Sequence, residues 1–222
     1  LYVAVQYTTA INAVLVNSIT PIIIALLSWL LYRETLHIRQ VLGIVLSLGG
    51  VLLILARGEV SQLLAVSFNR GDILVLLAAS AWSLYAVTLR RLSAELHPLA
   101  FLFAINAAGL VGLFPLYLLE LQQGLRIPLT VPAMLAVAYV SLCASVLAFL
   151  CWNYAVRIVG ANRAGPFVHL MPVFSAILAV IFLNEEPAWH QAKGAALIFT
   201  GIVLATYKVG QLNGKEEKKN RS

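Results

Sequence analysis

His169 is the residue of this sequence with the clearest capacity for chemistry inside an apolar segment. It stands within residues 164–184, which contain no Lys, Arg, Asp or Glu. Polar side chains in such surroundings usually face a bundle interior or water and mark functional positions. The imidazole can carry a proton near neutral pH, or it can bond a neighbouring carbonyl while neutral. Sequence alone leaves both roles open.

Two prolines, Pro21 and Pro172, interrupt apolar segments that otherwise read as helices. Proline removes a backbone hydrogen bond and bends the helix, which leaves a carbonyl free for a side chain, water or ligand. Small or polar residues recur beside both prolines at helical spacing. They are Gly165, His169, Pro172 and Ala176 in one segment, and Ser18, Pro21, Ala25 and Ser28 in the other. These stripes predict either a cavity wall or a close helix contact.

Amides, hydroxyls and aromatic rings within apolar segments can orient a polar substrate or form an apolar wall around it. The predicted cavity residues are Asn12, Asn17, Ser18, Pro21, Ser80, Trp82, Tyr85, Asn153, Tyr154, His169 and Pro172. Two glycine pairs are each seven residues apart on one helix face, which predicts tight helix packing rather than substrate binding. They are Gly43 with Gly50, and Gly194 with Gly201.

The sequence lacks the motifs of the common enzyme classes. It contains no GK[ST] phosphate-binding loop and no HExxH, and no carboxylate pair faces across an apolar segment. An intramembrane hydrolase would need a Ser–His pair, and His169 has no evident serine partner in the sequence. We therefore expect a protein that is not an enzyme, with no catalytic residue, metal or cofactor.

The elements that position these residues are predicted to be membrane-spanning helices. The chain is 61% hydrophobic and 11% charged, whereas soluble domains are about 25% charged. A spanning helix needs about 20 mostly apolar residues. Seven such segments are predicted, at residues 10–31, 40–56, 71–89, 98–119, 132–155, 164–183 and 192–208, of which the last is the least apolar. The fold class is thus an all-α polytopic membrane protein.

Residues 4–54 and 155–205 are two copies of one segment, offset by 151 residues without a gap. Thirteen of the 51 aligned positions are identical, including Pro21/Pro172, Glu34/Glu185 and Gln40/Gln191. Where one copy has arginine, the other does not. Arg33 and Arg39 align with Asn184 and His190, and Arg157 and Arg163 align with Gln6 and Asn12. The copies therefore place positive charge at opposite ends of corresponding helices.

The positive charges predict how the chain crosses the membrane. Eleven Lys and Arg residues fall on the side of the basic C-terminal segment, against four on the other side. Cytoplasmic loops carry the excess of Lys and Arg, so the C-terminus is predicted to be cytoplasmic. Five crossings separate the two copies, and an odd number inverts the second. We therefore expect inverted five-helix repeats, with seven spans present of ten and about 80 residues preceding Leu1 in the parent protein.

One stretch of residues carries a family resemblance. It runs from Leu147 through Cys151-Trp152-Asn153-Tyr154-Ala155 to Gly160-Ala161-Asn162-Arg163-Ala164, and continues with Met171-Pro172-Val173-Phe174, Glu185-Glu186 and Gln191 to Gly194. It resembles the EamA-type drug/metabolite transporter superfamily, and residues 7–43 are similar to the C-terminal half of the same domain. The resemblance implies a central cavity lined by the third, fourth, sixth, eighth and ninth helices. Members of this superfamily are described as exporting or exchanging amino acids, drugs, nucleotide sugars and other metabolites, so the resemblance does not specify the cargo.

These expectations give one organisation for the chain. Residues 1–56 form the C-terminal part of a first EamA-like repeat, 57–70 a loop, 71–208 a complete second repeat and 209–222 a basic cytoplasmic tail. The predicted function is secondary transport of a small metabolite, amino acid or drug by alternating access, as efflux across the plasma (bacterial inner) membrane. A non-transporting scaffold or regulatory subunit of the same fold is the alternative. The expected partners are the lipid bilayer, the small-molecule substrate, a proton or counter-substrate and a second copy in a homodimer, but no nucleic acid.

Overall fold

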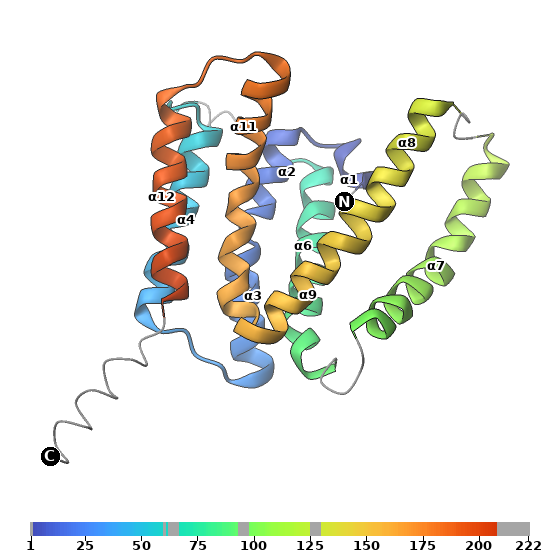
Figure 1. The fold of residues 1–222 in the computed structure, drawn as a ribbon, viewed down its shortest axis with the longest axis horizontal. Coiled ribbons are helices and arrows are strands. Elements are labelled where there is room, and N and C mark those ends of the chain that lie inside the picture. The colour runs from blue at the N-terminus through green and yellow to red at the C-terminus, as the bar shows by residue number, and fades with distance from the viewer. Residues whose placement is uncertain (1, 60, 62–66, 93–97, 125–129, 208–222) are drawn as a thin grey trace, which may run out of the picture. The chain divides into compact units, whose positions relative to one another are not determined.

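The computed structural model describes residues 2–59, 61, 67–92, 98–124 and 130–207, and in these ranges every regular element is a helix (Figure 1). The first group is α1 (Tyr2–Val5), α2 (Ala10–Asn17), α3 (Thr20–Tyr32), α4 (Ile38–Leu55), α6 (Arg70–Leu92) and α7 (Pro98–Gln122). The second is α8 (Val131–Tyr139), the π-helix η1 (Val140–Leu147), α9 (Ala148–Val159), α10 (Ala161–Ala164), the 3₁₀-helix η2 (Gly165–Leu170), α11 (Met171–Leu183) and α12 (Trp189–Thr206). The chain divides into two compact units, residues 1–87 with 161–222 and residues 88–160.

Six helical stretches among the described residues are long and apolar enough to cross a membrane. They are Ala10–Tyr32, Ile38–Leu55, Arg70–Leu89, Leu99–Gln122, Val131–Val159 and Ala161–Leu183, which match six of the seven predicted spans. The seventh forms as α12, an 18-residue helix that begins at Trp189 instead of 192. Its first turns hold His190, Gln191 and Lys193, and these polar residues lower its mean hydropathy.

Both prolines stand at helix interruptions in the first unit. Helix α2 ends at Asn17, and α3 begins at Thr20 with Pro21 in its first turn. In the second copy, α10 passes into the 3₁₀-helix η2, and α11 begins at Met171 with Pro172 in its first turn. Because proline cannot donate a backbone hydrogen bond, each break falls just before its proline.

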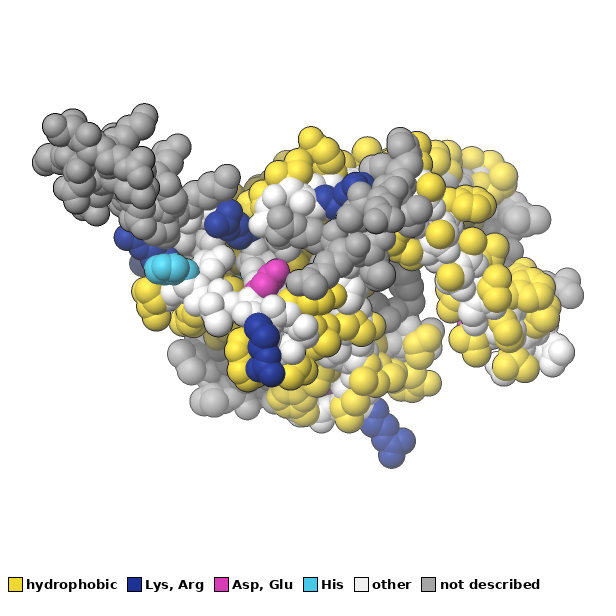
Figure 2. All heavy atoms as spheres, turned by 90° about the horizontal axis from the view of Figure 1, so that it is seen from below, with side chains coloured by type: hydrophobic (Ala, Val, Ile, Leu, Met, Phe, Trp, Pro, Cys, Tyr) yellow, Lys and Arg dark blue, Asp and Glu magenta, His cyan; other side chains and the backbone are white. Residues whose placement is uncertain are grey.

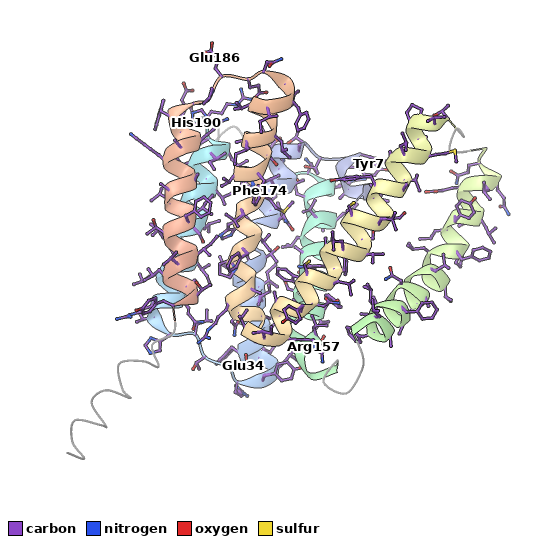
Figure 3. All side chains as sticks on the ribbon, viewed as in Figure 1. Tyr7, Glu34, Arg157, Phe174, Glu186 and His190 are labelled. Atoms are coloured by element: carbon purple, nitrogen blue, oxygen red, sulfur yellow. The ribbon has the colours of Figure 1, made fainter. Side chains whose placement is uncertain are left out.

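Corresponding helices in the two copies share their bounds and their caps. Helices α3 and α11 are displaced by 151 residues at both ends, as are α4 and α12. Arg33 and Asn184 both take left-handed backbone conformations, with φ of 56° and 54°. The loops that follow α3 and α11 lie at opposite ends of this unit, as Glu34 and Glu186 show in Figure 3.

Helices α4 and α12 pack along their whole length through the predicted glycines. A Cβ added at Gly43 would lie 2.5 Å from the Gly201 carbonyl oxygen, and one at Gly50 would lie 2.5 Å from that of Gly194. From Gly43 to Gly50 the residue number rises on α4, while that of the contacting glycine on α12 falls from 201 to 194, so the two helices are antiparallel. Buried side chains of α11 join the same core through Val173, beside Val51 and Ile198.

The second unit, residues 88–160, contains α7 and the continuous helical stretch α8–η1–α9. Eight consecutive residues of that stretch, Val140–Leu147, form a π-helix, which the sequence analysis did not predict. Neither α8 nor η1 has a buried residue, and large apolar side chains such as Val111 and Leu142 are exposed. Such surfaces are suited to contact lipid or other apolar helices.

Candidate functional site

A pocket lies in the first unit at the two proline interruptions. Its volume is about 100 Å³. The lining residues are Ala13, Val14, Asn17, Ser18, Val51, Val168, His169, Met171 and Pro172. They come from α2, its C-cap, α4, η2 and α11. The lining is mainly apolar, includes the polar residues Asn17, Ser18 and His169, and contains no Asp, Glu, Lys or Arg.

The break before Pro21 gives His169 its hydrogen-bond acceptor. In an unbroken helix the carbonyl of Ser18 would accept from the amide of Ile22, but that amide donates to Ile19 O instead, at 2.9 Å. The freed Ser18 carbonyl accepts a hydrogen bond from Nε2 of His169 at 2.8 Å. The change of hydrogen bonding at the break thus allows a contact between the two interrupted helices, and Ser18 and His169 occupy equivalent positions 151 residues apart.

Ser47 of α4 holds the other ring nitrogen of His169. The Ser47 hydroxyl lies 2.7 Å from Nδ1. A carbonyl can only accept, so Nε2 carries the proton, and a neutral imidazole then accepts from Ser47 at Nδ1. The same hydroxyl lies 3.0 Å from Ile44 O, which is its alternative acceptor. His169 is 1% exposed and Ser47 is fully buried, so their contact joins α4 to η2 in the interior.

This Ser–His contact corrects the expectation that His169 has no serine partner. A nucleophilic serine needs access to substrate and a base that is oriented by a third group. Ser47 is absent from the lining of the pocket, and the far nitrogen of His169 bonds a backbone carbonyl rather than a carboxylate. The Ser47–His169 hydrogen bond therefore connects α4 to η2 and does not form a catalytic pair.

Four predicted cavity residues, Asn17, Ser18, His169 and Pro172, line this pocket together. The amide of Asn17 lies 3.8 Å from Sδ of Met171, which also lines the pocket. Pro21 does not line the pocket and is buried in the first turn of α3, where its Cα would be 3.5 Å from a Cβ added at Gly165. The stripe of small residues predicted for the second copy continues at Ala176, which instead borders an apolar groove between α11 and α12.

Asn12 lies outside this pocket, in a polar cluster at the start of α6. Its Nδ2 donates to Asp72 at 3.1 Å and to the Ser67 carbonyl at 3.0 Å. The carboxylate of Asp72 also accepts from the hydroxyl of Thr8 and from the amide of Asn69. In return, the Asn69 side chain accepts from the Asp72 amide at 3.2 Å, which completes a capping box on α6. These contacts tie α6 to the segment around α2.

The remaining predicted residues lie on α6 and α9. The hydroxyl of Ser80 donates to Leu76 O of its own helix at 2.8 Å. Trp82 and Tyr85 contact each other, with ring centroids 5.5 Å apart. In the second unit Asn153 is buried, whereas Tyr154 is 68% exposed. None of these five lines the pocket at the proline breaks.

Ser47 and Asp72 are buried polar residues of the first unit that were not predicted from the sequence. A capping-box pattern, Asn69 followed three residues later by Asp72, could have identified the second. Nothing local identifies Ser47, because its partner is 122 residues away in the sequence. Among the described residues, no group of three or more His, Cys, Asp or Glu side chains could hold a metal ion.

Comparisons with known proteins agree with this architecture. The chain is 30% identical over 212 residues to an uncharacterized transporter of Archaeoglobus fulgidus, covering 95% of this chain and 71% of that protein. It is 26% identical over 218 residues to the uncharacterized transporter YyaM of Bacillus subtilis, covering 97% and 71%. A solved structure, "Crystal structure of protein", shares the fold with a TM-score of 0.72 at 23% identity, covering 92% of this chain and 69% of that one.

The family assignment rests on most of the chain. The sequence profile of the EamA-like transporter family matches residues 1–56 and 69–207, which include both proline-interrupted segments and every helix described above. Six described helices have the length and apolar composition of membrane spans, as a multi-pass integral membrane protein requires. The chain belongs to the EamA-like transporter family.

Proposed function

We propose that this protein is a secondary transporter that moves a small metabolite, amino acid or drug out of the cell by alternating access. The observation that carries the proposal is the pocket at the two proline breaks, where Ser18 and His169 meet. In transporters built from inverted repeats, substrates bind near the bilayer midplane beside interrupted helices. The plasma membrane is the proposed location.

The composition of the pocket favours one kind of substrate group. Its walls are mainly apolar, and no residue of its lining is Asp, Glu, Lys or Arg. An unpaired charge would be costly to bury against such walls. The part of the substrate that enters here is therefore uncharged and largely apolar, and the Asn17 amide offers it a polar contact. Any charged part of an amino acid substrate would have to bind outside this lining.

The proposed domain organisation follows from the equal bounds of the paired helices. Residues 1–56 belong to a first repeat, 57–70 connect the repeats, 71–208 form the second repeat, and 209–222 form a cytoplasmic tail that lies outside the described residues. Antiparallel α4 and α12 support an inverted relation between the copies. Rocking of one repeat against the other would open the pocket to each side in turn.

If transport is coupled to a proton, we propose that His169 binds that proton. The neutral imidazole is already hydrogen bonded at both nitrogens. A second proton would require the Ser47 hydroxyl to turn toward Ile44 O, an acceptor that already lies within reach. Replacing His169 by Ala should then abolish the pH dependence of transport. Unchanged transport and pH dependence in that variant would remove His169 from the mechanism.

Blocking the pocket tests the proposed transport site. Val14 lines the pocket from α2, whereas Ile11 of the same helix is 43% exposed and does not line it. Metabolites in the medium of cells that express the wild type, Val14→Trp or Ile11→Trp can be compared at matched membrane levels. We expect a metabolite that accumulates with the wild type and with Ile11→Trp to be lost with Val14→Trp. Equal export by both variants would exclude this pocket as the pathway, and no export by the wild type would favour the scaffold alternative.

A further inference from the structure

A second, polar pocket lies at one end of the first unit, away from the proline breaks. Its volume is about 270 Å³, against the roughly 30 Å³ that one water occupies in the liquid. The lining residues are Thr35, Leu36, His37, Arg39, Gln40, Arg163 and Tyr207. They come from the loop after α3, the first turn of α4, α10 and the residue after α12. Four separate segments of the chain therefore line this polar pocket.

The lining is positively charged. Arg39 and Arg163 bring two guanidinium groups from different helices, and no lining residue is acidic. Glu34, in the adjoining loop, is bonded by the Asn162 amide at 3.4 Å and does not line the pocket. In Figure 2 a His side chain lies beside Lys or Arg side chains on the face seen from below. Arginine presents paired donors that match the oxygens of a phosphate or carboxylate.

The start of α4 adds to this charge. The side-chain oxygen of Gln40 accepts from the His37 amide at 2.9 Å, which fixes the first turn of the helix. The next two amides, of Ile38 and Arg39, belong to the group of first-turn donors that have no acceptor within the helix. The positive end of the helix dipole also lies here. Thr35 and Tyr207, which also line the pocket, have hydroxyl groups that can donate hydrogen bonds.

The second copy shows that the fold itself does not require these arginines. At the start of α12, Gln191 bonds the Ala188 amide at 3.1 Å, as Gln40 bonds that of His37. The positions equivalent to Arg39, Arg163, His37 and Thr35 are His190, Asn12, Ala188 and Glu186. The same helix start thus occurs twice, and only the first copy surrounds it with arginines and no acid.

We propose that the pocket between α4, α10 and Tyr207 binds a phosphate group through Arg39 and Arg163. The proposal does not depend on the transport site. Phosphate carries oxygens enough to accept from both guanidinium groups and from the first-turn amides together. Two sources present this chemistry at a membrane surface: the headgroup of an anionic phospholipid, and soluble phosphate.

Lipid and phosphate binding to the whole purified chain in detergent tests the proposal. The probes are dioleoyl phosphatidylglycerol, dioleoyl phosphatidylcholine and inorganic phosphate, and the readouts are thermal shift and native mass spectrometry. The variant is Arg39→Gln with Arg163→Gln. Its matched control is Arg33→Gln with Arg157→Gln, which removes the same charge from the same predicted side without touching the lining.

Two results would support the site and identify its ligand. Phosphatidylglycerol would be assigned as the ligand if it stabilises the wild type and phosphatidylcholine does not. The apparent affinity for phosphatidylglycerol should then fall about tenfold in the pocket variant and stay unchanged in the control. Stabilisation by inorganic phosphate with the same dependence on Arg39 and Arg163 assigns a soluble phosphate. Absence of binding to the wild type, or an equal loss in both double variants, would overturn the proposal, since the arginines would then act only as general positive charge.

Discussion

The contact between His169, Ser18 and Ser47 depends on a few individual atoms. At the break before Pro21 the Ile22 amide bonds Ile19 O instead of the Ser18 carbonyl, and His169 donates to that free carbonyl at 2.8 Å. The Ser47 hydroxyl satisfies the other ring nitrogen at 2.7 Å. Because both bonds are buried, each partner left alone would carry a desolvation cost of about 1–3 kcal/mol.

Replacing His169 by Ala should therefore lower the free energy of unfolding by about 2–3 kcal/mol, since the Ser18 carbonyl loses its partner and the ring leaves a void. His190→Ala is the control, because that ring is only half-buried and packs at the edge of Trp189. We expect the control to change stability by less than about 0.5 kcal/mol. Denaturant unfolding of both purified variants measures the difference, and equal losses would contradict the proposed role of the buried bonds.

Sequence predicted part of this site for a physical reason. A proline inside an apolar segment must release a carbonyl, and a histidine there must find partners, so Pro21 and His169 were recognisable. The identity of the partners could not be predicted, because Ser47 is brought to His169 by the packing of α4 on η2. The same limit applies to Asn12, whose partner Asp72 depends on where α6 begins.

At the scale of elements, the α4–α12 contact depends on glycines that permit close backbone approach. The seven-residue spacing predicted the packing face. Both bounds of α4 and α12 and the C-terminal ends of α3 and α11 were predicted to within about three residues, because polar loops delimit them. The starts of α3 and α11 were not, because the predicted spans 10–31 and 164–183 ran through the breaks before Pro21 and Pro172. The π-helix at Val140–Leu147 was not predictable, since that stretch has no Gly or Pro to signal a change of helix type.

Adjacent glycines offer a matched test of this contact. A Cβ at Gly50 would lie 2.5 Å from the Gly194 carbonyl oxygen, whereas one at Gly49 has no atom within 4 Å. Gly50→Ala should destabilise the protein by about 1–3 kcal/mol through overpacking. Gly49→Ala should be neutral or stabilising by up to about 1 kcal/mol, because Ala favours a helix. Unfolding curves that rank the two variants in the opposite order would contradict the packing described for α4 and α12.

For the whole molecule, the charge distribution predicts one orientation in the membrane. The distribution of Lys and Arg predicts a cytoplasmic C-terminus and an outward loop after α11. The division into spans and the antiparallel α4–α12 pair are consistent with such a multi-pass arrangement.

Reporter fusions measure this orientation directly. A fluorescent protein at the C-terminus should fluoresce, because it folds in the cytoplasm, and alkaline phosphatase at the same position should be inactive. Phosphatase inserted after Glu186 should be active, because that loop is predicted to face outward. An active phosphatase at the C-terminus would reverse the orientation.

Alternating access requires the pocket at the proline breaks to open to both sides of the membrane, and thiol accessibility measures this opening. Asn17→Cys would be made in a chain that lacks the exposed Cys143 and Cys151, with Leu110→Cys on the exposed surface of α7 as the control. A membrane-impermeant thiol reagent would be applied to right-side-out and to inside-out vesicles. We predict labelling of Asn17→Cys from both faces and of Leu110→Cys from neither. Labelling of Asn17→Cys from one face only, or from neither, would contradict alternating access through this pocket.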